Sequence, residues 1–103
     1  MKGIISKFLA GKITLAEAIQ KHEGFKILME LILYNEEVPP EARINTRNIG
    51  KLSGLSTHIS SILRKLEADG WIILYTPENP HPKNNPPRIP IPTIRLKKLF
   101  KQE

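Results

Sequence analysis

Between residues 55 and 74 the hydrophobic positions follow a helical period and then change abruptly to a continuous apolar run. Four of these positions are spaced i, i+3, i+4 and i+7, which puts them on one face of an α-helix. Ser56 ahead of them is a suitable N-cap, and Gly70 behind them suits the left-handed residue that ends many helices. The pattern predicts a helix over residues 57–69, followed directly by a strand. The residues of its apolar face are Ile59, Ile62, Leu63 and Leu66.

The opposite face of this helix carries small hydroxyl side chains near its beginning and cations in its middle. No acidic residue occurs between Ser56 and Leu66, so no charge on this stretch repels phosphate. This arrangement suits a helix that enters the major groove of DNA, because its first turns approach base edges while longer cations reach phosphates. The alternative is an ordinary solvent-exposed helix face. The residues of this face are Thr57, Ser61, Arg64 and Ala68, flanked by His58, Ser60 and Lys65.

Two short helices are predicted near the N-terminus. Apolar residues at positions 4, 5, 8 and 9 predict an amphipathic helix that Gly11 ends. Thr14 and Glu17 have the spacing of a capping box, in which each side chain satisfies a backbone N–H of the other residue. A second helix should therefore begin at Leu15. His22 continues its apolar face and is expected to be a hydrogen-bonded boundary residue instead of a metal ligand.

The run over residues 25–34 is apolar around most of a helix and carries only two charges. Gly24 predicts a break or bend before it, and the two prolines at 39 and 40 end it. A helix of this kind is buried on more than one side. Its second side is covered either by another copy of the chain, which would make residues 1–35 a homodimer interface, or by the N-terminal helices of the same chain.

Residues 42–74 have the layout of a helix-turn-helix. A brief helix is expected over residues 47–52, with Ile49 and Leu52 directed inward. A tight turn containing Gly54 then leads to the helix over residues 57–69. A helix, a glycine-containing turn and a second, capped helix are typical of this motif.

Two antiparallel strands are expected after the second helix, over residues 71–76 and 89–96. The second strand contains Pro90 and Pro92, which cannot donate to a sheet ladder. Their spacing directs both positions away from the first strand, where they would lie on an open edge and block strand addition by another chain. Further along, Ile94 and Leu96 are expected to pair with an extended segment at Ile44. The hairpin over residues 71–96 thus predicts a sheet of two to three strands.

The loop over residues 77–88 contains five prolines and the cations Lys83 and Arg88. Proline makes such a loop stiff and extended, and its asparagines make it polar. A cationic arm beside a groove helix suits contact with phosphates or with the minor groove. The alternative is an exposed hairpin loop of no special role. The segment from Trp71 to the end carries a net charge of +4, which favours the arm.

The composition limits the function classes. The chain has 103 residues, a net charge of +6 and no cysteine, so we expect one domain that favours polyanions and has no disulfide or thiolate metal site. No apolar run reaches ~18 residues and no signal-like start is present, so a soluble, cytoplasmic protein without membrane contact is expected. No nucleophile, base and orienting group occur as a set, so neither enzyme activity nor a cofactor is expected. Fifteen isoleucines and proline-rich loops are typical of thermophiles.

The segment over residues 44–74, INTRNIGKLSGLSTHISSILRKLEADGWIIL, resembles the winged helix-turn-helix of bacterial and archaeal transcriptional regulators of the MarR and ArsR groups. With the 71–96 hairpin, the resemblance covers about half of the chain. Two features depart from the family: the wing loop is long and proline-rich, and thiolate metal sensing is impossible without cysteine. The matching residues are Thr46, Ile49, Leu52, Leu55, Ser56, Ile59, Ser60, Leu63, Leu66, Glu67, Gly70 and Trp71.

The resemblance implies a single α+β, mostly α, winged-helix domain over residues 1–103 that binds double-stranded DNA as a transcriptional regulator on the nucleoid. The helix over residues 57–69 would enter the major groove, with the hairpin as the wing and the N-terminal helices forming a homodimer. The alternative is a winged helix that binds proteins in a transcription, replication or division assembly. Arg64 is the strongest candidate, because a guanidinium can grip guanine or phosphate with two parallel bonds. The candidate DNA contacts are Arg47, Ser56, Thr57, His58, Ser60, Ser61, Arg64, Lys65, Lys83 and Arg88.

Overall fold

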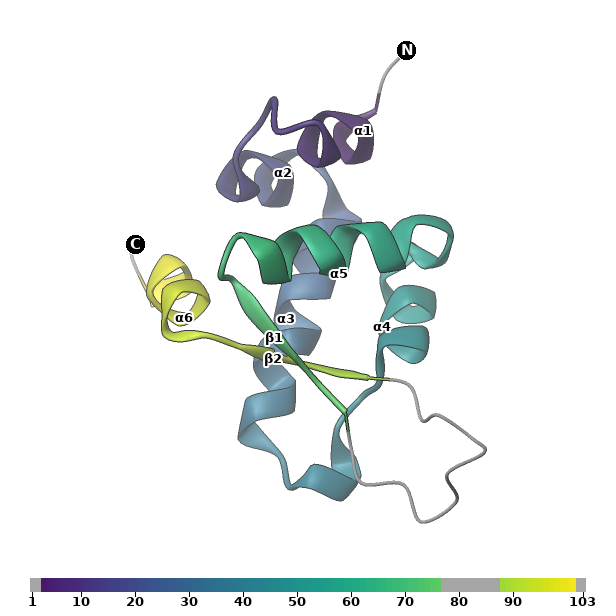
Figure 1. Ribbon diagram of the computed structural model, residues 1–103, viewed down its shortest axis with the longest axis vertical. Coiled ribbons are helices and arrows are strands. Elements are labelled where there is room, and N and C mark those ends of the chain that lie inside the picture. The colour runs from purple at the N-terminus through teal and green to yellow at the C-terminus, as the bar shows by residue number, and fades with distance from the viewer. Residues whose placement is uncertain (1–2, 77–87, 102–103) are drawn as a thin grey trace.

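The computed structural model describes residues 3–76 and 88–101 and has a mostly helical α+β architecture with one two-stranded antiparallel sheet. Helix α3 runs through the centre, and α2, α4 and strand β2 pack against it (Figure 1). Helices α4 and α6 lie on opposite sides of the β-hairpin. The helices are α1 (Ile4–Leu9), α2 (Leu15–Lys21), α3 (Glu23–Glu37), α4 (Thr46–Ser53), α5 (Ile59–Ala68) and α6 (Ile94–Lys101), with 3-10 turns η1 (Pro40–Ala42) and η2 (Ser56–His58), and the strands are β1 (Ile72–Tyr75) and β2 (Ile89–Pro92).

The helix boundaries near the N-terminus follow the sequence signals. Gly11 follows α1 with a φ of 75°, a left-handed conformation that glycine adopts without strain. The capping box of Thr14 and Glu17 is present, so the start of α2 at Leu15 is confirmed. His22 ends α2 and caps α3, because its Nδ1 accepts a hydrogen bond from the Gly24 N–H at 3.0 Å. The break therefore falls at His22, and Gly24 lies in the first turn of α3.

The second side of α3 is covered by its own chain. Four apolar side chains of α3 are each 0% exposed, and they contribute to a core that also contains residues of α1, α2, α4, α5, β1 and α6. The intrachain alternative for this helix is thus confirmed. Gly24 permits the closest approach, since a Cβ there would lie 2.8 Å from the Ser53 carbonyl oxygen. The buried residues of α3 are Phe25, Leu28, Met29 and Ile32.

The hairpin after α5 is present, with Ile72 opposite Pro92 and Tyr75 opposite Ile89. The Thr93 N–H donates to the Trp71 carbonyl at 3.1 Å. Since N–H groups two residues apart in a strand point to the same side, the proline positions of β2 face away from β1, as the spacing predicted.

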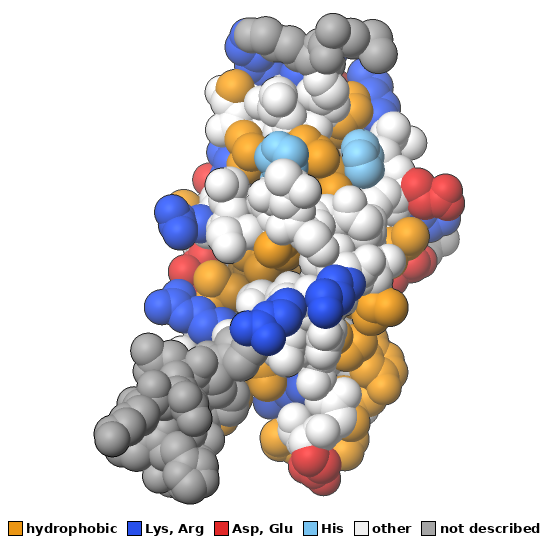
Figure 2. Space-filling view, turned by 90° about the vertical axis from the view of Figure 1, so that its right-hand side faces the viewer, with side chains coloured by type: hydrophobic (Ala, Val, Ile, Leu, Met, Phe, Trp, Pro, Cys, Tyr) orange, Lys and Arg blue, Asp and Glu red, His pale blue; other side chains and the backbone are white. Residues whose placement is uncertain are grey.

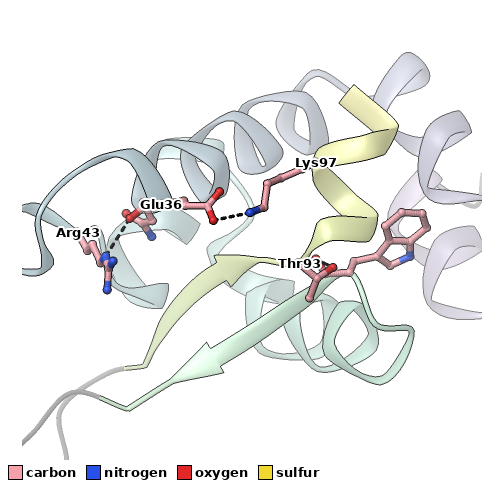
Figure 3. Close-up of polar contacts among 6 residues, drawn as sticks. Glu36, Arg43, Thr93 and Lys97 are labelled. Carbon is pink, nitrogen blue, oxygen red and sulfur yellow. Dashed lines mark hydrogen bonds and ion pairs between the residues drawn. The ribbon is translucent and has the colours of Figure 1, made fainter. Parts of the chain in front are cut away.

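The predicted strand over residues 89–96 is wrong beyond Pro92, because residues Ile94–Lys101 form α6. The alternation of apolar residues up to Leu96 was interpreted as a strand, but Leu96, Leu99 and Phe100 also have helical spacing. In α6, Leu96 lies in the core, and Leu99 and Phe100 pack against it. Figure 3 shows Lys97 reaching from α6 to Glu36 on α3, and this ion pair ties α6 to the centre of the fold. Arg95 stacks on the Trp71 ring, with its Cζ 4.0 Å from the ring centroid, and donates to the Asp69 carbonyl.

The predicted third strand at Ile44 is also wrong, and a buried side chain takes its place. Asn35 on α3 is 0% exposed, and its Nδ2 donates to the carbonyls of Ile44 at 2.9 Å and Pro90 at 3.1 Å. Its Oδ1 accepts from the Ile44 N–H at 2.7 Å. The prediction of an open edge on the far side of β2 is therefore wrong. Asn35 bonds the Pro90 carbonyl on that edge, and the Thr46 N–H donates to the Arg88 carbonyl at 2.9 Å.

Candidate nucleic-acid interface

Helices α4 and α5 meet at a tight junction that fixes the angle between them. Gly54 ends α4 with a φ of 77°, and Leu55 beyond it is only 2% exposed. Gly50 of α4 faces the start of α5, and a Cβ there would lie 3.2 Å from Ser56 Cα and Ile59 Cβ. Small residues are needed at this contact because the backbones approach closely. The predicted turn at Gly54 and the inward position of Leu55 are confirmed.

Two local predictions for this junction are wrong. Ser56 makes no side-chain capping bond, and the segment Ser56–His58 forms a 3-10 turn before α5 begins at Ile59. A 3-10 turn closes i to i+3 bonds, so the His58 N–H donates to the Leu55 carbonyl. Leu52 is not directed inward and is 59% exposed, because α4 turns only Ile49, Gly50 and Ser53 toward the core.

The end of α5 forms a Schellman motif around Gly70, whose left-handed conformation was predicted. Gly70 has a φ of 80°, its N–H donates to the Glu67 carbonyl at 3.1 Å, and the Trp71 N–H donates to the Leu66 carbonyl at 2.9 Å. The Thr93 hydroxyl bonds the Gly70 carbonyl at 2.7 Å, which connects this turn to the end of β2. Because these bonds fix the exit of α5, the hairpin starts at a defined angle to the helix.

Eight of the ten predicted contact residues are exposed. The outward side of η2 and α5 presents the hydroxyl, histidine and arginine side chains, and Arg47 projects from the first turn of α4. Arg88 is exposed immediately before β2, whereas Lys83 lies outside the described residues. The exposed predicted residues are Arg47, Ser56, Thr57, His58, Ser60, Ser61, Arg64 and Arg88.

Lys65 does not join this surface. Its Nζ lies 3.1 Å from the Asp69 carboxylate and 5.6 Å from the centroid of the Phe8 ring, so the side chain turns toward α1. Lys65 and Arg64 are neighbours in sequence, but they face different sides of α5. Lys65 was predicted to flank the face that carries Arg64, and it lies at the edge of the apolar stripe, where its ammonium group faces the ring of a core phenylalanine. Its contact with DNA stays a prediction.

A crevice of about 300 Å³ separates α5 from the base of the hairpin. Arg64 of α5 and Arg88 at the start of β2 both line it, and Glu67 lies between α5 and β1. The Glu67 Oε2 accepts a hydrogen bond from the Leu74 N–H at 3.1 Å, which joins α5 to β1 beyond the Schellman turn. The full lining consists of Thr46, Ile59, Ser60, Leu63, Arg64, Glu67, Leu74 and Arg88.

Figure 2 shows the face on which α4 and the beginning of α5 lie. Lys and Arg side chains gather in a band across its middle, while the visible Asp and Glu side chains lie toward its edges. Positive charge in such a band attracts a polyanion and lowers the free energy of its approach at low ionic strength. This face therefore carries a band of cations, and a crevice lies between α5 and the base of the hairpin.

Sequence reasoning missed three residues that shape this surface: Asn35, Thr46 and Glu67. Asn35 follows the buried Ile32 by three residues, so its amide lies on the core face of α3. That position could have indicated from the sequence that the amide has buried hydrogen-bond partners. The bond of the Thr46 N–H to Arg88 had no sequence signal, because the two residues are far apart in the chain. Glu67 matched the family pattern, but its hydrogen bond to the Leu74 N–H of β1 had no sequence signal.

The described ranges contain no cluster of three or more acidic or histidine side chains that could hold a metal ion. No helix within the same ranges combines the length and hydrophobicity that crossing a membrane requires. Comparisons with protein-family models, with curated proteins and with solved structures found no match.

Proposed function

We propose that the chain is a winged helix-turn-helix domain that binds double-stranded DNA sequence-specifically as a transcriptional regulator. In this proposal α4 and α5 are the helix-turn-helix, α5 is the helix of the major groove, and the β1–β2 hairpin is the base of the wing. The observation that carries the proposal is the exposed outward face of η2 and α5, which has hydroxyls at its start, Arg64 in its middle and no acidic residue before Glu67.

The dimensions of α5 are compatible with this role. Its 10 residues span about 15 Å at 1.5 Å per residue, and the major groove of B-DNA is about 12 Å wide. Ser60 and Ser61 are short enough to let the helix approach base edges. Arg64 is about one turn further on, where its longer side chain can reach guanine O6 and N7 or a phosphate with two bonds.

Arg47 and Arg88 flank α5 and are proposed to contact phosphates. Arg47 is exposed in the first turn of α4, and Arg88 lines the crevice with Arg64. Contacts to phosphates fix the register of a protein on the duplex but carry no sequence information. We therefore assign specificity to α5, and orientation to the two flanking arginines. Lys83 remains part of the proposal as a wing contact.

Selection of bound duplexes from a random pool tests the proposal directly. A specific DNA-binding domain should enrich a defined site, and its affinity should fall with salt, with log K decreasing by about 0.9 per log unit of salt for each phosphate contacted. Enrichment of no site, together with no measurable duplex binding at low salt, would refute DNA binding.

Arg64→Ala tests the assigned reading surface. We expect the variant to lose about 1–3 kcal/mol of specific binding and to keep its fold, because Arg64 is exposed. Lys98→Ala is the matched control, since it removes the same charge from an exposed position on α6, away from α4. Equal affinities of the two variants for the selected site would remove Arg64 from the reading surface.

Dimerisation through residues 1–35 is part of the proposal, although the burial of α3 leaves a smaller surface for it. Half-buried apolar side chains on α1 and α2, such as Ile5, Leu9 and Ile19, are the ones that a second copy could cover. A dimer should select a two-fold repeat with half-sites about one helical turn, ~10 bp, apart. A monomer by sedimentation that selects a single half-site would refute this part alone.

A second candidate function is a winged helix that docks on a protein. The observation that favours it is the outer face of β1, where Ile73 is 57% exposed and Tyr75 is 43% exposed. Exposed apolar and aromatic side chains are more typical of protein contacts than of phosphate contacts. Substitution of both residues by serine should leave duplex affinity unchanged if DNA is the target, and should abolish partner binding if a protein is.

A further inference from the structure

Arg88 occupies a position where the hairpin itself gives it little support. The last pair of the described ladder joins Tyr75 to Ile89, and Arg88 lies one residue beyond that pair. Strand residues beyond the final ladder pair are the first to fray, because they lack both ladder bonds and buried apolar contacts. The arginine is exposed, yet it lines a crevice with Arg64. Some other contact must therefore keep its backbone next to α5.

That contact comes from the first residue of α4. The Thr46 N–H donates to the Arg88 carbonyl at 2.9 Å. The first N–H groups of a helix have no intrahelical acceptor, so Thr46 can give its N–H to another segment without loss to α4. Asn45 caps the same helix end by accepting from the Asn48 N–H at 2.9 Å, which keeps α4 regular around this connection.

Asn35 supports the same connection from the inside of the fold. Its Nδ2 bonds the Pro90 carbonyl, two residues after Arg88, and the Ile44 carbonyl, two residues before Thr46. Both segments are thereby attached to one buried side chain of α3. In addition, the Arg43 Nε donates to the Asn35 backbone carbonyl at 2.9 Å (Figure 3). The wing base and the start of α4 are held at a fixed separation without a third strand.

We infer that the Thr46 N–H bond to Arg88, backed by Asn35, positions the Arg88 guanidinium for a phosphate contact, so that α4 and the wing engage DNA as one unit. This inference rests on the proposed DNA binding. Thr46 and Asn35 are positioning groups here, and Arg88 is the group that touches the nucleic acid. The partner is the phosphate backbone of duplex DNA adjacent to the groove that α5 enters.

Thr46→Pro removes the connecting N–H and puts the proline Cδ where that hydrogen pointed, so the Arg88 carbonyl, 2.9 Å from the nitrogen in the natural chain, has to move away. Proline is well tolerated at the first position of a helix, and Asn45 is already extended, with φ of −80° and ψ of 169°, as a residue before proline must be. Thr46→Ala is the reference variant, because it loses the same hydroxyl and keeps the N–H. Circular dichroism and thermal unfolding verify that both variants fold.

The readout is the salt dependence of duplex affinity for the natural chain, Thr46→Pro, Thr46→Ala, Arg88→Ala and the double variant of Thr46→Pro with Arg88→Ala. Loss of one phosphate contact reduces the slope of log K against log salt by about 0.9. We expect Arg88→Ala to show this reduction relative to the natural chain, and Thr46→Pro to show it relative to Thr46→Ala. The slope of the double variant should fall by no more than that of Arg88→Ala alone.

Three results would overturn the inference while the natural chain still binds duplex DNA. The first is a slope for Thr46→Pro equal to that of Thr46→Ala. The second is a double variant whose slope falls by the sum of the two single reductions. The third is an unchanged slope for Arg88→Ala, which refutes the inference even if Thr46→Pro does not fold. Failure of the natural chain to bind any duplex is a different result and refutes the proposed function itself.

Discussion

Replacement of Asn35 by leucine should destabilise the protein because it removes a buried amide that serves two separate segments. Leucine keeps the branching and the number of heavy side-chain atoms, so the change leaves no cavity, although its two methyl groups are bulkier than the amide and add some crowding to the loss of the hydrogen bonds. Three hydrogen bonds disappear, at 2.9, 3.1 and 2.7 Å, and they leave the Ile44 N–H, the Ile44 carbonyl and the Pro90 carbonyl without this partner.

The expected cost follows from how deeply each of these groups is buried. The bond to Pro90 is fully buried, and leaving such a carbonyl unsatisfied costs about 1–3 kcal/mol. The two bonds to Ile44 are only partly buried, so water can replace them in part, at a cost of roughly 1 kcal/mol together. The sum is about 3 kcal/mol, which a domain of typical stability, about 5–15 kcal/mol, survives.

Urea unfolding followed by the fluorescence of Trp71, the single tryptophan, measures this loss. With a slope of about 1.5 kcal/mol per molar urea, the midpoint should fall by about 2 M. Tyr34→Leu is the control, since Tyr34 precedes Asn35 on the same helix and is 45% exposed; its stability should change by less than about 0.5 kcal/mol. A loss below about 1 kcal/mol for Asn35→Leu would refute the reasoning, because the amide would then contribute little beyond what water can supply.

Two further stability predictions concern α3 and α4. Gly24→Ala should lower the free energy of unfolding by about 1–3 kcal/mol, because its Cβ would lie 2.8 Å from the Ser53 carbonyl oxygen; a melting temperature equal to that of the natural chain would contradict this close helix contact. Leu52→Ser should change the free energy of unfolding by less than about 0.5 kcal/mol, since Leu52 is 59% exposed. Ile49→Ala on the same helix should lower the free energy of unfolding by about 2–5 kcal/mol, since Ile49 is fully buried. Similar losses for Leu52→Ser and Ile49→Ala in urea unfolding would show that Leu52 is directed inward after all.

The features that the sequence predicted correctly depend on neighbouring residues. The capping box of Thr14 and Glu17, the helix end at Gly11, the turn at Gly54 and the left-handed Gly70 after α5 all use atoms within five residues of one another. Their geometry is set by backbone sterics and short loops, which residue types control directly. The outward direction of Ser60, Ser61 and Arg64 followed equally directly, because the apolar spacing of α5 leaves one face for solvent.

Local patterns misled where two solutions satisfied them equally well. Residues 89–96 alternate as a strand would, yet Leu96, Leu99 and Phe100 also have helical spacing. The helix from Ile94 is favoured because it places all three of these side chains in or against the core. On a helical wheel Lys65 lies beside the cationic face of α5, but its Nζ contacts the ring of Phe8 and the carboxylate of Asp69.

The sequence by itself determined the end of α1 at Gly11, the start of α2 at Leu15, the apolar stripe of α5, and that a hairpin follows α5. Only the tertiary structure decided how the edge of that hairpin is satisfied and therefore where Arg88 lies. Asn35 bonds residues 9 and 55 positions away in the chain, and the Thr46 N–H donates to the carbonyl of Arg88, 42 positions away. Such bonds have no periodic signature, because a buried carbonyl requires only that some donor be in reach, and the packing of α3, α4 and β2 selects which donor that is.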